Sequence, residues 1–382
     1  MRIRALALVA VTLVTGSLQA AAQAAASSSL DFSGVMFGNW MMRTDSAAKA
    51  GLGGKAPNRF DLGRVYLNFR MPAGERGSIR ATTDLFQNTT AGYYSGWALR
   101  FKYAYFQYNA TSSLAGIDGL SMVARVGMLH NVVVEHMDSY WPRWMSQNAV
   151  ETHGFFASAD MGAATLVTLP GRRGEAYFTV MNGNGYTAAE TDRFKDVAAR
   201  FSWTPFANDS GFLRTLALTP WYSIGRSGGA FQSGGAGQVG PVTEGIQRDR
   251  RGLFAGLRDR RLTAGAEFSQ RIEEVESGAN TVGSPRVVRN RTSDLISAFA
   301  IVRPLELVDR SRRSRLALFS RIDDFQFDDT PAPVSTSLAW FGLFWDLNPR
   351  ATVTIDYQVM TSRSGTTSVP AKSLFLHWVA NY

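Results

Sequence analysis

The sequence of 382 residues contains no cysteine and only four histidines. The absence of cysteine excludes disulfide bridges and thiolate metal sites. His130, His136 and His153 lie near one another and near Glu135, but their spacing fits no ligand motif, and we interpret them as loop histidines. We therefore predict neither a metal nor a cofactor.

Long apolar runs are also lacking, and the mean hydropathy is −0.10. The run "ALALVAVTLV" at residues 5–14 is shorter than the roughly 20 residues that a membrane-spanning helix needs. It follows the basic "MRIR" and precedes the small residues of "QAAAQA", which together are typical of a secretory signal peptide rather than a membrane anchor. We predict a signal peptide at 1–24 and one mature domain at 25–382.

Aromatic residues and glycine are abundant, with 24 Phe, 12 Tyr, 9 Trp and 36 Gly. They occur in segments such as "RVYLNFRMP" (64–72), where apolar and polar side chains alternate strictly. Period-two alternation indicates a β-strand with two different faces. The same pattern returns in segments around residues 78–86, 97–105, 122–128, 197–203, 262–271, 315–323 and 352–360.

The links between these segments alternate between short and long. Short turns are expected at 73–77, 170–174, 258–261 and 348–350, and long linkers at 131–152, 227–250 and 274–291. "NGNG" (182–185) is interpreted as a hairpin turn and "DRSRRSR" (309–315) as a periplasmic turn, not a nucleic-acid site. The rhythm predicts an all-β fold, a transmembrane antiparallel β-barrel of about 16 strands with short periplasmic turns and longer extracellular loops.

The apolar row of each strand should then face lipid, and the polar row an aqueous lumen. Aromatic residues at strand ends are typical of the girdles at the membrane interfaces. In the last segment, "SLFLHWVANY", alternate residues are apolar or aromatic up to Tyr382. That ending resembles the C-terminal strand signal read by the barrel-insertion machinery. We predict the bacterial outer membrane, with lipid and lipopolysaccharide as surroundings; the expected girdle residues are Trp97, Tyr105, Trp203, Trp345 and Trp378.

Two segments carry a family resemblance. "RFDLGRVYLNFRM…SIRATTDLF" with "LRFKYAYFQYN" and "ARVGMLH", and then "GEAYFTVMNGNGY…RFKDVAARFSWTPF", resemble bacterial outer-membrane porins of the phosphate-selective (O/P-type) family, over roughly residues 60–206. The resemblance implies a trimeric, sixteen-stranded channel that passes anions through a narrowed pore. Phosphate specificity is not carried over, because the family's constriction residues find no one-to-one match here.

Basic side chains share the lumen parity of the predicted strands. An excess of guanidinium would raise the local anion concentration, whereas pairing with the acids Asp84, Asp160, Glu267, Asp323 and Asp356 would only solvate the lumen. Both interpretations stay open. The candidate pore-lining residues are Arg64, Arg70, Arg80, Arg100, Lys102, Arg125, Arg200, Arg271 and Arg321.

The third long loop, at 131–151, is the candidate constriction. It is too apolar and aromatic for a solvated tip, so it should pack in the lumen or against a neighbouring subunit. Its candidate residues are Glu135, His136, Asp138, Tyr140 and Arg143.

These features predict a passive porin, not an enzyme, for small hydrophilic solutes, with a preference for phosphate-like or carboxylate anions and a homotrimeric assembly. No residues are predicted to be catalytic. The alternatives are a non-selective general porin, a barrel enzyme with Ser, His and acid at one rim, or an adhesin or secreted β-sandwich.

Overall fold

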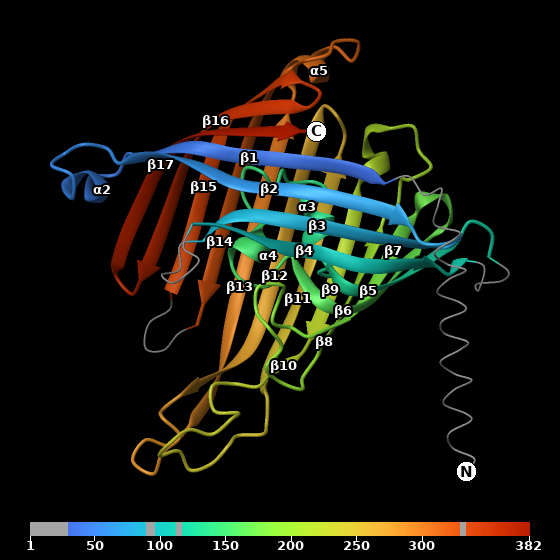
Figure 1. Cartoon of the computed structure of the whole chain (residues 1–382). Helices are drawn as coiled ribbons and strands as arrows, with labels where there is room; N and C mark the ends of the chain where they lie inside the picture. Colours follow the sequence, from blue (N-terminus) through green and yellow to red (C-terminus); the bar gives the residue numbers. More distant parts are fainter. Residues whose placement is uncertain (1–29, 89–95, 112–116, 329–333) are drawn as a thin grey trace, which may run out of the picture.

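The computed structural model describes residues 30–88, 96–111, 117–328 and 334–382. Its strands form one antiparallel sheet that closes on itself, because β1 pairs with both β2 and β17 (Figure 1). The strands are β1 Asp31–Arg43, β2 Asn58–Pro72, β3 Gly77–Asn88, β4 Gly96–Asn109, β5 Ser121–His130, β6 Ala159–Thr168, β7 Gly174–Met181, β8 Asp196–Trp203, β9 Ala217–Ile224, β10 Arg226–Ser227, β11 Ile246–Arg258, β12 Leu262–Ser277, β13 Val287–Val302, β14 Leu316–Phe327, β15 Val334–Asn348, β16 Ala351–Ser364 and β17 Thr367–Asn381.

The barrel has sixteen spanning strands. The two-residue β10 continues β9 beyond Gly225, and both pair with β11. The predicted fold class is therefore confirmed. The predicted signal peptide lies outside the described residues, and no helix in the described part of the chain is long and apolar enough to cross a bilayer.

Side-chain alternation places the apolar rows outside. On β14, Leu318 and Ile322 are more than half exposed on the outer face, whereas Arg321 and Asp323 are buried inside. An outer surface this apolar is stable when it contacts hydrocarbon, as in transmembrane barrels. Trp97, Trp203 and Trp345 share this exposed outer face, as predicted.

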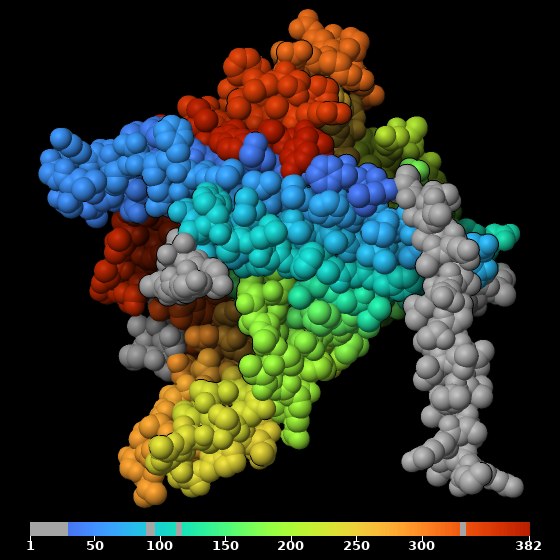
Figure 2. Space-filling model, in the orientation of Figure 1, coloured from blue at the N-terminus to red at the C-terminus, as the bar shows by residue number. Residues whose placement is uncertain are grey.

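Strand connections define two ends, which we call the turn end and the loop end. The turn end carries the four predicted short turns, both chain termini of the barrel and the connection 303–315 with α5 (Pro304–Val308), which includes "DRSRRSR". At the loop end, 44–57 contains α2 (Ser46–Ala50), and the connections 228–245 and 278–286 meet, since Val239 N donates to Asn280 O. These two connections form the yellow and orange projection in Figure 2.

Three boundaries differ from the prediction. Strands β12 and β13 extend through half of the expected linker 274–291, and β11 begins at Ile246, inside the expected linker 227–250. "NGNG" opens a fourteen-residue connection, 182–195, rather than a tight hairpin. The strands continue into the expected linkers because their backbone groups find partners across the ladder.

The prediction for Tyr105 was wrong. A bulge in β4 lies opposite Thr82 and Thr83, so Lys102 is the extra residue and the parity changes there. Phe101 faces outward, whereas Tyr103 and Tyr105 are buried inside against the ring of His130. A bulge inserts one unpaired residue and so exchanges the two faces of the strand beyond it.

Candidate functional site

The connection between β5 and β6, residues 131–158, lies inside the barrel, and we call it the inner loop. It contains the short helices α3 (Val134–Asp138) and α4 (Ala149–Thr152). The ring of Trp141 is 1% exposed and packs edge-to-face on Phe299 and Trp340 of the inner wall, with ring centroids 5.2 Å apart in both contacts. Burial of aromatic rings on both surfaces makes this contact one apolar anchor of the loop. A second, larger cluster packs Phe155 and Phe156 of the loop on other residues of the wall.

Polar contacts fasten the loop to the same wall. Arg321 donates to the Gln147 carbonyl at 2.8 Å, and His153 lies 3.3 Å from the Asp323 carboxylate. Arg271 donates to Gly154 O at 2.8 Å. These wall side chains hold the loop, and the aromatic cluster fills the lumen next to β13–β15, so free space remains on the side of β2–β9.

Arg143 holds the loop together internally. Its guanidinium contacts Asp138 at 2.9 Å and Glu151 at 2.8 Å, and Asn148 bonds Asp138 as well. The carboxylates are largely buried, so they need this partner. Arg143 therefore joins two acids within the inner loop and shapes the loop.

Several predicted pore-lining residues are paired. Asp84 is fully buried between Arg100 at 3.0 Å and Arg64 at 3.5 Å. The Arg100 guanidinium also lies 3.8 Å from the ring centroid of Phe86. Lys102, at the β4 bulge, is 3% exposed and contacts the ring of Tyr66. Arg64 and Arg100 are partly exposed, whereas Lys102 has little contact with water.

Arg70, Arg80 and Arg125 lie toward the turn end, on the wall formed by β2, β3 and β5. Arg80 is 3.7 Å from Glu135 of the inner loop, and Glu135 is also 2.9 Å from His130. Burial alone would raise the pKa of Glu135, but His130 and Arg80 lower it to about 2, so the carboxylate is charged at neutral pH.

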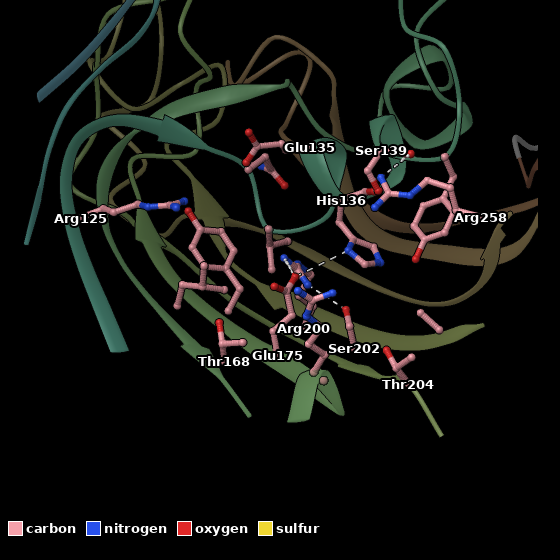
Figure 3. Close-up of a pocket in the computed structure, with 18 residues that line it drawn as sticks. Arg125, Glu135, His136, Ser139, Thr168, Glu175, Arg200, Ser202, Thr204 and Arg258 are labelled. Atoms are coloured by element: carbon pink, nitrogen blue, oxygen red, sulfur yellow. Dashed lines mark hydrogen bonds and ion pairs between the residues drawn. The ribbon is translucent and has the colours of Figure 1, made fainter. Parts of the chain in front are cut away.

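The inner loop and strands β5–β9 enclose a cavity of about 420 Å³, which we call the turn-end cavity (Figure 3). Its size is that of a small-molecule pocket. Arg200 pairs there with Glu175 at 2.6 Å. Burial, together with Arg200 and Arg258, lowers the pKa of His136 to about 3, so its ring is neutral. The charged lining residues are Arg125, Arg172, Arg200 and Arg258 against Glu135 and Glu175.

Two further cavities adjoin this one. A cavity of about 680 Å³ along β2–β5 shares Arg125 and Glu135 with it. A smaller cavity of about 220 Å³ toward the loop end shares Asn131 with it, and is lined by Asp160, Asp196 and Arg250. Among these three cavities, guanidinium groups outnumber carboxylates in the turn-end cavity, whereas the cavity along β2–β5 has equal numbers of the two.

Sequence reasoning missed Glu151, Glu175, Arg172 and Arg258. Glu175 shares the inward parity of Tyr177 on β7, so the alternation of "GEAYFTV" could have revealed it. Arg258 ends β11 and reaches Ser139 O at 3.2 Å, a contact that only the folded loop creates. Nothing local in the sequence signals such a contact.

The three loop histidines do not meet. His130 contacts Glu135, His136 lies 3.0 Å from Thr219, and His153 contacts Asp323. Within the described ranges, no three metal-ligating side chains gather. Ser297 donates to the Asp323 carboxylate that His153 also contacts, whereas nucleophilic catalysis needs the imidazole on the hydroxyl itself.

No protein-family model matches the sequence, and comparison with curated proteins found no match. Solved structures do match over nearly the whole chain. The outer membrane channel DcaP of Acinetobacter baumannii is 10% identical with a TM-score of 0.62, covering 93% of this chain and 97% of its own. The anion-selective porin of Comamonas acidovorans is 10% identical with a TM-score of 0.56, covering 93% and 100%. This chain has the fold of an outer-membrane porin.

OprB of Pseudomonas putida is similar in structure as well. It is 8% identical with a TM-score of 0.59, and the match covers 92% of this chain and 94% of its own. At such identities the likeness concerns the fold. The resemblance to phosphate-selective porins stays a prediction, since no family match supports that finer assignment.

Proposed function

We propose that the protein is an outer-membrane porin through which small hydrophilic solutes diffuse passively, with a preference for anions. The observation that carries this proposal is the turn-end cavity, where four arginines face two glutamates beside the inner loop. A narrow, water-accessible lumen with excess guanidinium attracts anions and repels cations. Phosphate-like and carboxylate solutes are the expected classes.

The test is the reversal potential of the purified mature protein in a planar bilayer under a KCl gradient. We expect the sign of the reversal potential to show that anions carry most of the current. We expect a weaker preference for anions in Arg125→Gln and Arg258→Gln. Arg313→Gln is the matched control, since this exposed arginine on the connection 303–315 lies outside the cavity. A cation-selective wild-type channel would refute the proposed preference.

A non-selective general porin is the second candidate. It is favoured by the carboxylate contacts of Arg64, Arg100 and Arg200, which neutralise much of the wall charge. This candidate predicts a reversal potential near zero and no change in the arginine variants. The same measurement therefore separates the two.

We further propose a homotrimer in the outer membrane, surrounded by lipid and lipopolysaccharide. Support comes from the fold and from OmpT of Vibrio cholerae, solved in a trimer form, which is 9% identical with a TM-score of 0.58 and covers 93% of this chain and 99% of its own. The strand ending near Tyr382 would be read by the barrel-insertion machinery before it pairs with β1. Native mass spectrometry in detergent tests the trimer.

A further inference from the structure

Of the four arginines that line the turn-end cavity, Arg125, Arg172 and Arg258 have no carboxylate within ion-pair distance in the described part of the chain. Arg125 and Arg258 are the two of these that flank the cavity. Arg125 donates from Nε to the amide oxygen of Gln107 at 3.0 Å, and Arg258 donates to the Ser139 carbonyl. Arg200, by contrast, is neutralised by Glu175. Figure 3 shows Arg125 and Arg258 on opposite sides of the cavity, with the Arg200–Glu175 pair between them. Each of the two retains N–H groups for an incoming anion.

Both guanidinium groups lie beside aromatic rings. Arg125 is 5.8 Å from the ring centroid of Tyr177, and Arg258 is 5.8 Å from that of Tyr140. Leu166, which is paired with Tyr177 across β6 and β7, adds a partly exposed apolar side chain to the same wall. The ring of Tyr177 is itself buried, so the apolar surface that a solute can cover is that of Leu166 and of Tyr140, both partly exposed.

Such a wall discriminates among anions by more than charge. An inorganic anion gains only the guanidinium contact and must give up part of its hydration. A carboxylate on a ring gains the same contact and also removes apolar area from water. The cavity, at about 420 Å³, is large enough for a single-ring acid.

We propose that the turn-end cavity is a binding site for organic anions with an apolar body, of the class of aromatic monocarboxylates, and that it favours them over small aliphatic and inorganic anions. This inference rests on the proposed porin function and names its solute class. Arg125 supplies the charge-assisted hydrogen bonds, and Leu166 with the ring of Tyr140 supplies the apolar contact.

The probe is benzoate, compared with acetate and inorganic phosphate at equal concentration, added to the reconstituted mature protein carrying a KCl current. We expect benzoate to reduce the current at a concentration about tenfold below that needed by acetate, because ring burial strengthens its binding. A bi-ionic reversal potential then gives the relative permeability of the two carboxylates.

Two substitutions separate charge from apolar contact. Arg125→Gln should weaken the block by benzoate about tenfold, since a charge-assisted bond is lost. Leu166→Asn keeps the charge, so it should weaken the benzoate block severalfold while it shifts the KCl reversal potential less than Arg125→Gln does. Arg313→Gln, which lies outside the cavity, should leave the block unaltered.

Three results would overturn the inference. One is an anion-preferring channel in which the permeabilities to acetate and benzoate are in the ratio of their mobilities in water. That result would leave the proposed function intact. Another is a benzoate block that persists in both Arg125→Gln and Leu166→Asn, which places binding elsewhere. A cation-selective wild type would overturn the proposed anion preference and this inference together.

Discussion

His136 is held neutral by the way the inner loop packs. Its ring lies between Thr219 and the loop, near Arg200 and Arg258, and its pKa is lowered to about 3 by burial and by these two cations. When the loop opens, the imidazole returns to water, where its pKa is close to 6.5. Below pH 6.5 the open state therefore binds a proton that the packed state does not.

The sign of the pH effect follows from this difference. As the pH falls from 6.5 toward 3, the packed loop loses stability relative to the open loop, by about 2 kcal/mol at pH 5. Hydrogen exchange of the amides of residues 132–141 should thus be faster at pH 5 than at pH 7, after correction for intrinsic rates. His136→Gln should remove most of that dependence; an unchanged dependence in this variant would assign it to another group.

Arg143 is predicted to act on loop structure more than on pore charge. In Arg143→Ala the carboxylates of Asp138 and Glu151 lose their shared partner, and such a loss costs about 3–5 kcal/mol when the charges are buried. We expect faster hydrogen exchange across residues 138–152. The double variant Arg143→Ala with Glu151→Gln should recover part of the protection, and no recovery would argue against the ion pair as the cause.

At the scale of elements, the ring of Trp141 is one of the apolar contacts that join the inner loop to the wall. Trp141→Ala should remove about 3–5 kcal/mol of packing against Phe299, Phe319 and Trp340. The loop should then leave the wall for part of the time. Single-channel recordings should show noisier currents with higher conductance levels.

Trp97→Ala is the control for this prediction. Trp97 is half exposed on the outer face, so this variant removes the same kind of side chain at a position away from the lumen. It should leave conductance unchanged. Equal conductance in wild type and Trp141→Ala would show that the loop stays in place without this ring, held by Arg321 and Arg271.

The bulge in β4 is the second feature at the scale of elements that determines which side chains face the lumen. It carries Tyr103 and Tyr105 from the lipid face into the lumen, where they support His130 and the start of the inner loop. The bulge also leaves Lys102 buried beside Tyr66 and Tyr103. One inserted residue thus changes which side chains reach the lumen on the strand that follows.

For the whole molecule, closure depends on the seam between β1 and β17. The ring of Tyr382 lies over Gly34, where a Cβ atom would come within 2.2 Å of it, and the ring of Trp378 covers Gly38. Backbone bonds between Gly34 and Tyr382 run in both directions. The C-terminal aromatic is therefore part of the closed barrel.

Gly34→Val should displace the Tyr382 ring and destabilise the seam, by about 1–3 kcal/mol as for overpacked sites. The expected result is unfolding at a lower temperature, measured by heat-modifiable migration on a detergent gel. Gly283→Val is the control, since a Cβ there meets open space. In the Gly34→Val background, Tyr382→Ala should cost less than it does alone; strictly additive effects would contradict the proposed clash.

Most of the barrel could be predicted from the sequence, because the side-chain period of a strand is two and each face meets one solvent. The alternation in "RLALFSRID" correctly placed Leu318 outside and Arg321 inside. The four short turns were also located correctly. Local signals failed where backbone geometry broke the period, as at Lys102 and Tyr105.

The candidate site was decided by tertiary structure. The sequence by itself determined that basic side chains occupy one face of several strands, since parity is a local property. It could not determine that Arg321 anchors the inner loop, that Arg143 joins two acids within it, or that Arg258 reaches Ser139. These contacts join residues on separate elements, and only the closed barrel brings the loop and the wall within hydrogen-bond distance.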